Sequence, residues 1–335
     1  MEEFNNQEAT NENVNFESRI NLAPLLLSIT AIKAELGTVI VGQSKMIDQM
    51  LVAILSNGHV LLEGVPGVAK TITAKLLAKT LNVGFSRIQF TPDLMPSDIL
   101  GTSVYDLKKS EFEFKKGPIF SNLILIDEIN RAPAKTQAAL FEVMEERQIT
   151  MDGTQYILDA PFLVIATQNP IEQEGTYRLP EAQLDRFLFK ISIDYPILED
   201  EITIIQREHS LQNNGKLENI KTILSGSDIK NYQSLVKQII IEPQLIEYIA
   251  KIVVNTRENA FLYLGASPRA SIAILNAAKG FAAIRGRDFV TPEDIKEATI
   301  PVLQHRVIVT PEREMEGISS IEIIKQIIES VEIPR

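Results

Sequence analysis

The sequence has no cysteine, no tryptophan and only three histidines. Without cysteine the chain forms no disulfide, offers no thiolate nucleophile and supplies no cysteine ligands to zinc. His59, His209 and His305 are far apart in the sequence and fit no metal-ligand spacing. The composition therefore excludes cysteine-dependent chemistry and argues against a transition-metal enzyme.

Long apolar runs and targeting signals are also lacking. No stretch of about 18 apolar residues occurs, and the most apolar segment, 22–32, is interrupted by Pro24, Ser28 and Thr30. The first residues, MEEFNNQEATNENVNFESR, are acidic and rich in Asn, unlike a signal peptide. We expect no membrane insertion and a cytoplasmic location.

Basic residues are in the minority. Acidic residues number 44 and basic residues 33, which gives a net charge of −11. This balance argues against nucleic acid as the main partner, because phosphate-binding proteins are usually basic. The length of 335 residues and a hydrophobic content of 45% indicate a globular protein of about two domains.

The pattern along the chain predicts three regions. Residues 1–20 are polar and are expected to form a disordered tail. Residues 21–196 carry apolar runs at 60–62, 123–126 and 162–166, the pattern of strands buried on both faces of a parallel sheet. A helix is expected at 134–146, where Leu140, Val143 and Met144 share one face. We predict an α/β domain of parallel strands with flanking helices.

Residues 197–335 are expected to form a small all-helical domain. Leu245, Ile249, Ile252 and Val253 follow the spacing of one apolar helix face. Helix starts are predicted at Ser267-Pro268 and at Thr291-Pro292, where a hydroxyl cap precedes a proline in the first turn.

A phosphate-binding loop follows the first apolar run. The segment GVPGVAKT matches G-x-x-x-x-G-K-S/T except that alanine replaces the second glycine. Backbone N–H groups at the start of a helix bind phosphate oxygens, the lysine reaches the β- and γ-phosphates, and the threonine hydroxyl is a Mg²⁺ ligand. The alternative is a plain turn with a solvated lysine. The loop residues are Gly64, Val65, Pro66, Gly67, Val68, Ala69, Lys70 and Thr71.

Two acids follow the second apolar run, LILIDE. A buried strand that ends in Asp127 places its carboxylate at the edge where open α/β sheets bind ligands. We expect Asp127 to hold Mg²⁺ together with Thr71, and Glu128 to act as the general base on the attacking water. Loop and acids together predict a nucleoside triphosphatase. ATP is favoured over GTP because no Asn-Lys-x-Asp segment is present.

Four segments in this order, GVPGVAKT, LILIDEINRAP, IATQNPIEQEGTYRLPEAQLDRF and GASPRA, resemble the MoxR family of AAA+ ATPases. The similarity runs from about Val39 to about Val309. It implies a P-loop AAA+ sheet domain followed by a lid domain, with ATP and Mg²⁺ as cofactors. The alanine in the loop also occurs in that family.

The resemblance assigns further residues. Asn169 resembles the sensor-1 residue that orients the lytic water, although an Asn before Pro170 is also a common turn former. Arg186 resembles the arginine finger that enters a neighbouring subunit. It competes for that role with Arg178, and it would otherwise be a surface arginine paired with Asp185.

Two more sites depend on the resemblance. Arg269 resembles the sensor-2 arginine of the lid; its place in the first turn of a helix disfavours a cation unless an anion compensates. Whether it acts on its own nucleotide or on a neighbour's stays open. The segment Val41, Gly42 and Gln43 resembles the loop that contacts adenine.

Two inserted hairpins are expected within the α/β domain. Segment 105–114 carries Phe112 and Phe114 on one face, and segment 148–158 has a turn at Asp152-Gly153. In the family such hairpins face the pore of a ring; the plain alternative is a pair of edge hairpins.

The implied function is a chaperone-like remodeller. The resemblance implies a homo-hexamer that matures a client protein or inserts its metal cofactor, often with a partner bearing a von Willebrand factor A domain. One alternative is a DNA-dependent hexameric motor, for which the lysines near 108–116 offer a small basic patch. Another is an ATP-gated assembly scaffold with slow turnover.

Overall fold

The computed structural model describes residues 19–170, 176–210 and 220–334. The predicted tail, 1–20, lies almost wholly outside the described residues. The predicted domain limits, 21–196 and 197–335, stay predictions. No helix in the described part of the chain is long and apolar enough to cross a lipid bilayer.

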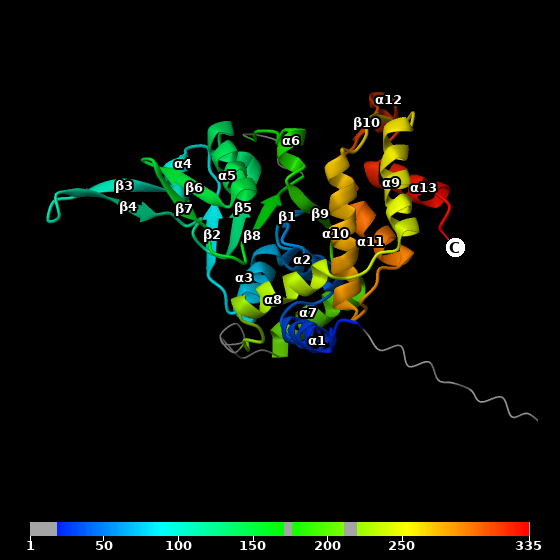
Figure 1. Ribbon diagram of the computed structural model, residues 1–335, viewed down its shortest axis with the longest axis horizontal. Helices are drawn as coiled ribbons and strands as arrows, with labels where there is room; N and C mark the ends of the chain where they lie inside the picture. The colour runs from blue at the N-terminus through cyan, green and yellow to red at the C-terminus, as the bar shows by residue number, and fades with distance from the viewer. Residues whose placement is uncertain (1–18, 171–175, 211–219, 335) are drawn as a thin grey trace, which may run out of the picture.

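A five-stranded parallel sheet forms the centre of the protein (Figure 1), in the order β2-β5-β8-β1-β9. The three apolar runs predicted to be buried strands form β5, β8 and β1, the three interior strands, so the predicted α/β class is confirmed. The strands are β1 (His59–Gly64), β2 (Phe85–Gln89), β5 (Leu123–Asp127), β8 (Leu163–Gln168) and β9 (Phe187–Ile193).

Helices cover both faces of this sheet. Val60 and Leu62 face a core shared with α1, α2 and α3, whereas Leu61 faces a core shared with α5. The alternation explains why the run 60–62 is apolar at every position. The expected helix at 134–146 is present as α5. The helices of this part are α1 (Ala23–Gly37), α2 (Ser44–Leu55), α3 (Lys70–Thr80), α4 (Pro96–Leu100), the 3-10 helix η1 (Ile129–Arg131), α5 (Ala134–Glu146) and α6 (Glu181–Leu184).

The rest of the described chain is mainly helical and packs beside the sheet (Figure 1). The sequence predicted that this part would be all-helical. The structure adds one small antiparallel pair of strands, β10 (Leu262–Leu264) and β11 (Ile308–Val309). Two strands this short carry too few residues for a period of two to be read from sequence. The helices are α7 (Leu198–Ser210), α8 (Gly226–Lys237), α9 (Pro243–Glu258), α10 (Pro268–Ile284), α11 (Pro292–Leu303), α12 (Pro311–Met315) and α13 (Ser320–Ser330).

Helix α10 begins at Pro268, as its sequence predicts, but its cap differs. The Ser267 side chain makes no capping hydrogen bond to its own helix. Its hydroxyl donates instead to Asp185 Oδ2, at 3.4 Å. The predicted cap bond is therefore wrong, because a contact with a residue 82 positions away in sequence takes its place.

The two inserted segments form antiparallel hairpins. Strands β3 (Gly101–Asp106) and β4 (Glu111–Lys116) form the first, which projects far from the sheet (Figure 1). Strands β6 (Gln148–Met151) and β7 (Thr154–Ile157) form the second. Asp152 and Gly153 both have positive φ, at 50° and 77°, the backbone form that a two-residue hairpin turn of type I′ requires.

Candidate nucleotide site

The phosphate loop connects β1 to α3 at the carboxyl edge of the sheet. Gly67 and Ala69 both have positive φ, at 88° and 62°. The Lys70 Nζ donates to the carbonyl oxygen of Gly64 at 2.5 Å, so the lysine lies across its own loop. Burial lowers the pKa of Lys70, although the charges of Asp127, Glu128 and Glu63 oppose that shift.

The acidic pair lies opposite the loop. Asp127 is buried at the end of β5, where its Oδ1 accepts from the Thr167 hydroxyl at 3.3 Å. Its Oδ2 pairs with the Arg87 Nε at 2.6 Å. Both oxygens of this carboxylate are therefore oriented by neighbouring strands, β8 and β2.

Glu128 is held by three contacts. Its backbone N–H donates to the Thr167 hydroxyl at 3.1 Å. Its Oε2 accepts from the Gln89 amide at 3.0 Å and pairs with the Arg131 Nε at 2.8 Å. With φ at 58°, its backbone is in the left-handed region that most residues avoid.

Loop, acids and Asn169 line one cavity of about 400 Å³. Asn169 follows β8, and like Asp127 it stands where a parallel strand ends. The five polar side chains predicted from the sequence all line this cavity, although they come from different parts of the chain: Lys70, Thr71, Asp127, Glu128 and Asn169. Such an arrangement binds a polyphosphate and presents a carboxylate to it.

Sequence reasoning missed Arg87, Gln89 and Thr167. The first two alternate along β2, and Gln89 lies in register with Asp127. A signal was available, because polar residues at alternate positions near the carboxyl end of a strand point to the ligand edge of a sheet. What the sequence does not give is that β2 is the strand next to β5.

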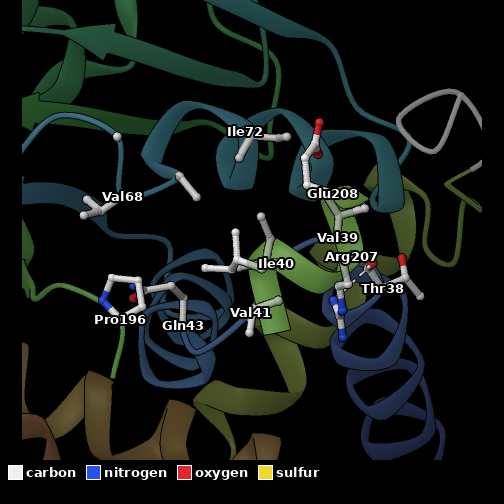
Figure 2. Close-up of a pocket in the computed structure, with 13 residues that line it drawn as sticks. Thr38, Val39, Ile40, Val41, Gln43, Val68, Ile72, Pro196, Arg207 and Glu208 are labelled. Atoms are coloured by element: carbon white, nitrogen blue, oxygen red, sulfur yellow. Dashed lines mark hydrogen bonds between the residues drawn. The ribbon is translucent and has the colours of Figure 1, made fainter. Parts of the chain in front are cut away.

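A second cavity, of about 330 Å³, adjoins the first. The two share Gly67, Ala69 and Ile72 in their walls. Figure 2 shows Ile72 of α3 and Ile40 on opposite sides of this pocket, with Arg207 and Glu208 of α7 along its edge. An apolar pocket beside a phosphate site suits a flat heterocyclic base.

Two of the three residues of the predicted adenine segment lie at this pocket. Val41 and Gln43 line the second pocket. Gly42 is not among the lining residues; a Cβ at this position would lie 2.3 Å from the Asp200 Oδ2, so the loop is closely packed on α7. Arg207 of α7 also donates to the carbonyl oxygen of Gly37, at 2.9 Å.

The three predicted arginines lie outside both cavities. Arg186 pairs with Glu145 at 2.7 Å, not with Asp185, and Asp185 pairs with Arg306 at 2.6 Å. Arg269 contacts the same Glu145 at 3.3 Å, so this acid supplies the compensating anion within the chain. Arg178 is exposed and pairs with Glu181 at 3.3 Å. The structure thus brings Arg186 and Arg269 together, but away from the phosphate loop.

The histidines take no part in the site. His59 and His305 are both buried and bonded to backbone groups. Within the described residues, no group of three or more His, Cys, Asp or Glu side chains could hold a metal ion.

Comparison with known protein families finds two matches. Residues 59–189 match the model described as the ATPase family associated with various cellular activities (AAA). Residues 254–327 match an AAA lid domain. The first range contains the phosphate loop, the acidic pair, Asn169 and Arg186, and the second contains Arg269.

Similar proteins cover almost the whole chain. Chaperone MoxR1 of Mycobacterium tuberculosis is 44% identical over 310 residues, 90% of this chain and 81% of that protein. YeaC of Bacillus subtilis, an uncharacterized protein, is 44% identical over 89% of this chain and 92% of its own. The crystal structure of a Cytophaga hutchinsonii protein assigned as an ATPase superposes with a TM-score of 0.86 at 45% identity, over 94% of this chain and 97% of that one.

Proposed function

Because the chain belongs to the MoxR family of AAA+ ATPases, we propose that it uses ATP hydrolysis to remodel a client protein. The observation that carries this proposal is the single cavity shared by the phosphate loop, Asp127, Glu128 and Asn169. A relative of 44% identity is named a chaperone, which supports action on another protein.

The residues of the cavity fit a magnesium ion. The Thr71 hydroxyl and the Asp127 carboxylate are the hard oxygen ligands that Mg²⁺ prefers, and both line the phosphate cavity. The ion, when bound, neutralises charge on the phosphate oxygens. Arg87 and Thr167 fix the orientation of Asp127, and a fixed ligand binds its ion more tightly.

The hydrolytic step falls to Glu128 and Asn169. The Glu128 carboxylate accepts the proton of the water that attacks the γ-phosphorus, while the bond from that phosphorus to the β–γ bridging oxygen breaks. Asn169 orients this water. Lys70 leaves the Gly64 carbonyl to bind the β- and γ-phosphates.

The arginines complete the site of a neighbouring copy. Arg186 and Arg269 lie together and line neither cavity of their own chain. We assign Arg186 as the finger because it shares Glu145 with Arg269, whereas Arg178 pairs with Glu181. Arg269 then acts in trans beside it. This arrangement needs a ring, and the hexamer that the family resemblance implies is part of the proposal.

The hairpins transmit the force. The Ser103 hydroxyl donates to Asp152, which joins the first hairpin to the turn of the second. The Phe114 ring lies 4.5 Å from that of Tyr156, and Phe120 contacts both. We propose that the two hairpins move as one arm in the pore of the ring and act on a client. Insertion of a metal cofactor into the client, with a partner bearing a von Willebrand factor A domain, belongs to this proposal.

A Glu128→Gln variant tests the proposal. The amide keeps the size of the side chain but accepts no proton, so turnover is expected to fall by about 10²-fold or more. The dissociation constant for ATP, measured by calorimetry with Mg²⁺, is expected to stay within about threefold.

Glu142→Gln, an exposed change on α5, is the matched control and is expected to keep wild-type turnover. The trapped Glu128→Gln protein, loaded with ATP, then serves to co-purify the client. A variant that hydrolyses ATP at the wild-type rate contradicts the assignment of the base. Stimulation of the wild-type ATPase by DNA contradicts the remodelling proposal and favours the nucleic-acid motor.

A further inference from the structure

Two arginines from distant parts of the chain share one carboxylate. The Arg186 Nη2 lies 2.7 Å from the Glu145 Oε2, and the Arg269 Nη2 lies 3.3 Å from the Oε1. The Arg186 Nη1 also donates to the carbonyl oxygen of Phe141, one turn earlier in α5. Each carboxylate oxygen thus serves a different arginine, one from the sheet domain and one from the lid.

The charges at the two helix ends favour this contact. The last turn of α5 holds Glu145 and Glu146 and no basic residue, although the helix dipole favours cations there; the cap residue that follows, Arg147, donates to Asn57. The first turn of α10 holds Arg269 and no acid, although the dipole there favours anions. Contact between the two ends compensates both mismatches. Two arginines against one bonded carboxylate still leave an excess positive charge.

The lid also binds the residue before Arg186. Asp185 accepts from the Ser267 hydroxyl of the lid at 3.4 Å and pairs with the Arg306 Nε at 2.6 Å. Arg306 is almost fully buried and donates further to the carbonyl oxygens of Asp185 and Phe187. A movement of the lid therefore acts on the finger segment through Asp185 and on the finger itself through Glu145.

Helix α5 links this cluster to the acids of its own site. At its start, the Gln137 amide donates to the carbonyl oxygens of Ile129 and Ala132, which follow Glu128. Glu145 lies at its other end. The helix has 13 residues and is therefore roughly 20 Å long. Glu145 is half-exposed at a side-chain exposure of 40%, as suits a residue at a surface that a second copy reaches.

We propose that Glu145 is a positioning residue that holds Arg186 and Arg269 as one unit, directed at the nucleotide of the neighbouring subunit. The proposal rests on the proposed function, since it takes Arg186 as a finger acting in trans. Its specific content is that the two arginines act together only while Glu145 is ionised and bonded to both. Glu145 itself touches neither nucleotide.

Glu145→Gln tests this in the full-length protein. The amide keeps the shape and loses the charge, so kcat is expected to fall about tenfold. KM for ATP and the dissociation constant for a non-hydrolysable ATP analogue are expected to stay within twofold, because Glu145 lines neither cavity. Glu146→Gln, which removes the adjacent acid, is the matched control and is expected to keep wild-type kinetics; Glu146 has no ion pair in the described part of the chain.

A double-variant comparison separates positioning from general structure. If Glu145 holds the two arginines together, the effects of Arg269→Ala and Glu145→Gln are not independent. The kcat of the double variant is then expected to lie within about twofold of the kcat of the slower single variant. Multiplicative effects, wild-type turnover of Glu145→Gln, a raised KM or a smaller oligomer by light scattering would each overturn the proposal. Arg186→Ala is measured in parallel. Wild-type turnover in that variant rejects the finger and with it the proposed function, whereas loss of turnover there and not in Glu145→Gln rejects the role of Glu145 alone.

Discussion

Two non-glycine residues of the candidate nucleotide site have a backbone in the left-handed region. Ala69 and Glu128 both line the phosphate cavity and have φ of 62° and 58°. Each such conformation costs a non-glycine residue on the order of 1–3 kcal/mol. The common loop pattern has glycine at the position of Ala69, and glycine adopts a positive φ without this cost. The surrounding fold therefore holds Ala69 and Glu128 in backbone conformations that the free chain would avoid.

His59 is a second residue whose state the fold dictates. Its Nδ1 accepts from the N–H of Val164 at 3.0 Å, and its Nε2 donates to the carbonyl oxygen of Met144 at 3.1 Å. Only the neutral ring does both. Burial, with a smaller contribution from the Arg147 charge, lowers the pKa of His59 to about 4.

The pH dependence of stability follows from this shift. The unfolded histidine takes a proton near pH 6.5 and the folded one near pH 4, so stability is present above pH 6.5 and is lost as the pH falls toward 4. At pH 5 the loss from His59 is about 2 kcal/mol. The Gln amide of a His59→Gln variant can still donate to Met144 but does not titrate. Between pH 7 and pH 5 we expect the free energy of unfolding, measured in urea, to fall by about 2 kcal/mol less in this variant than in the wild type. Equal losses in the two proteins would show that His59 is not held neutral.

At the scale of elements, the first hairpin depends on a close backbone crossing. Gly101 has φ of 106°, a conformation available mainly to glycine. A Cβ there would lie 2.2 Å from the carbonyl oxygen of Lys115 and 2.7 Å from the N atom of Gly117. Where the first hairpin begins, the two strands therefore pack so closely that no side chain fits at Gly101.

Gly101→Ala is expected to open this base. The strand pairing of residues 102–116 should weaken by more than about 2 kcal/mol, the sum of backbone strain and the clash. Hydrogen exchange of these amides measures it. Gly153→Ala is the control, since that residue also has positive φ but no atom within 4 Å of the added Cβ. Its expected cost is about 1 kcal/mol. Equal exchange in both variants would contradict the crossing as the source of the effect.

Sequence predicted the interior strands and missed the outer ones. Strands β1, β5 and β8 each contain an unbroken apolar run because both faces of the sheet are covered, and that pattern is visible in the residues themselves. Edge strand β2 has a single buried side chain, Ile88, between the polar residues Arg87 and Gln89. Its residues Arg87 and Gln89 reach Asp127 and Glu128 only through the order of the strands. Such long-range neighbours are absent from any local pattern.

At the scale of the molecule, lid and sheet share one core. Helices α9, α10, α11 and α13 belong to the same apolar cluster as α1, α2 and α3. The lid is therefore coupled to the nucleotide loop, since α3 begins at Lys70. The family resemblance singles out Arg186 and Arg269 as candidate site residues. It does not point to the Glu145 carboxylate between them, which lies 124 residues from Arg269 in the sequence and is brought there only by the fold.

Mixing two inactive variants tests the central claim, that one copy binds and hydrolyses ATP with arginines supplied by the next. Glu128→Gln lacks the base but retains its arginines, and Arg186→Ala lacks the finger but retains its base. In mixed assemblies an Arg186→Ala pocket next to a Glu128→Gln subunit contains every required group. The ATPase activity of the mixture is predicted to exceed the sum of the two proteins measured separately and to peak at an intermediate ratio. A mixture as inactive as its components, under conditions where light scattering shows co-assembly, would contradict the account.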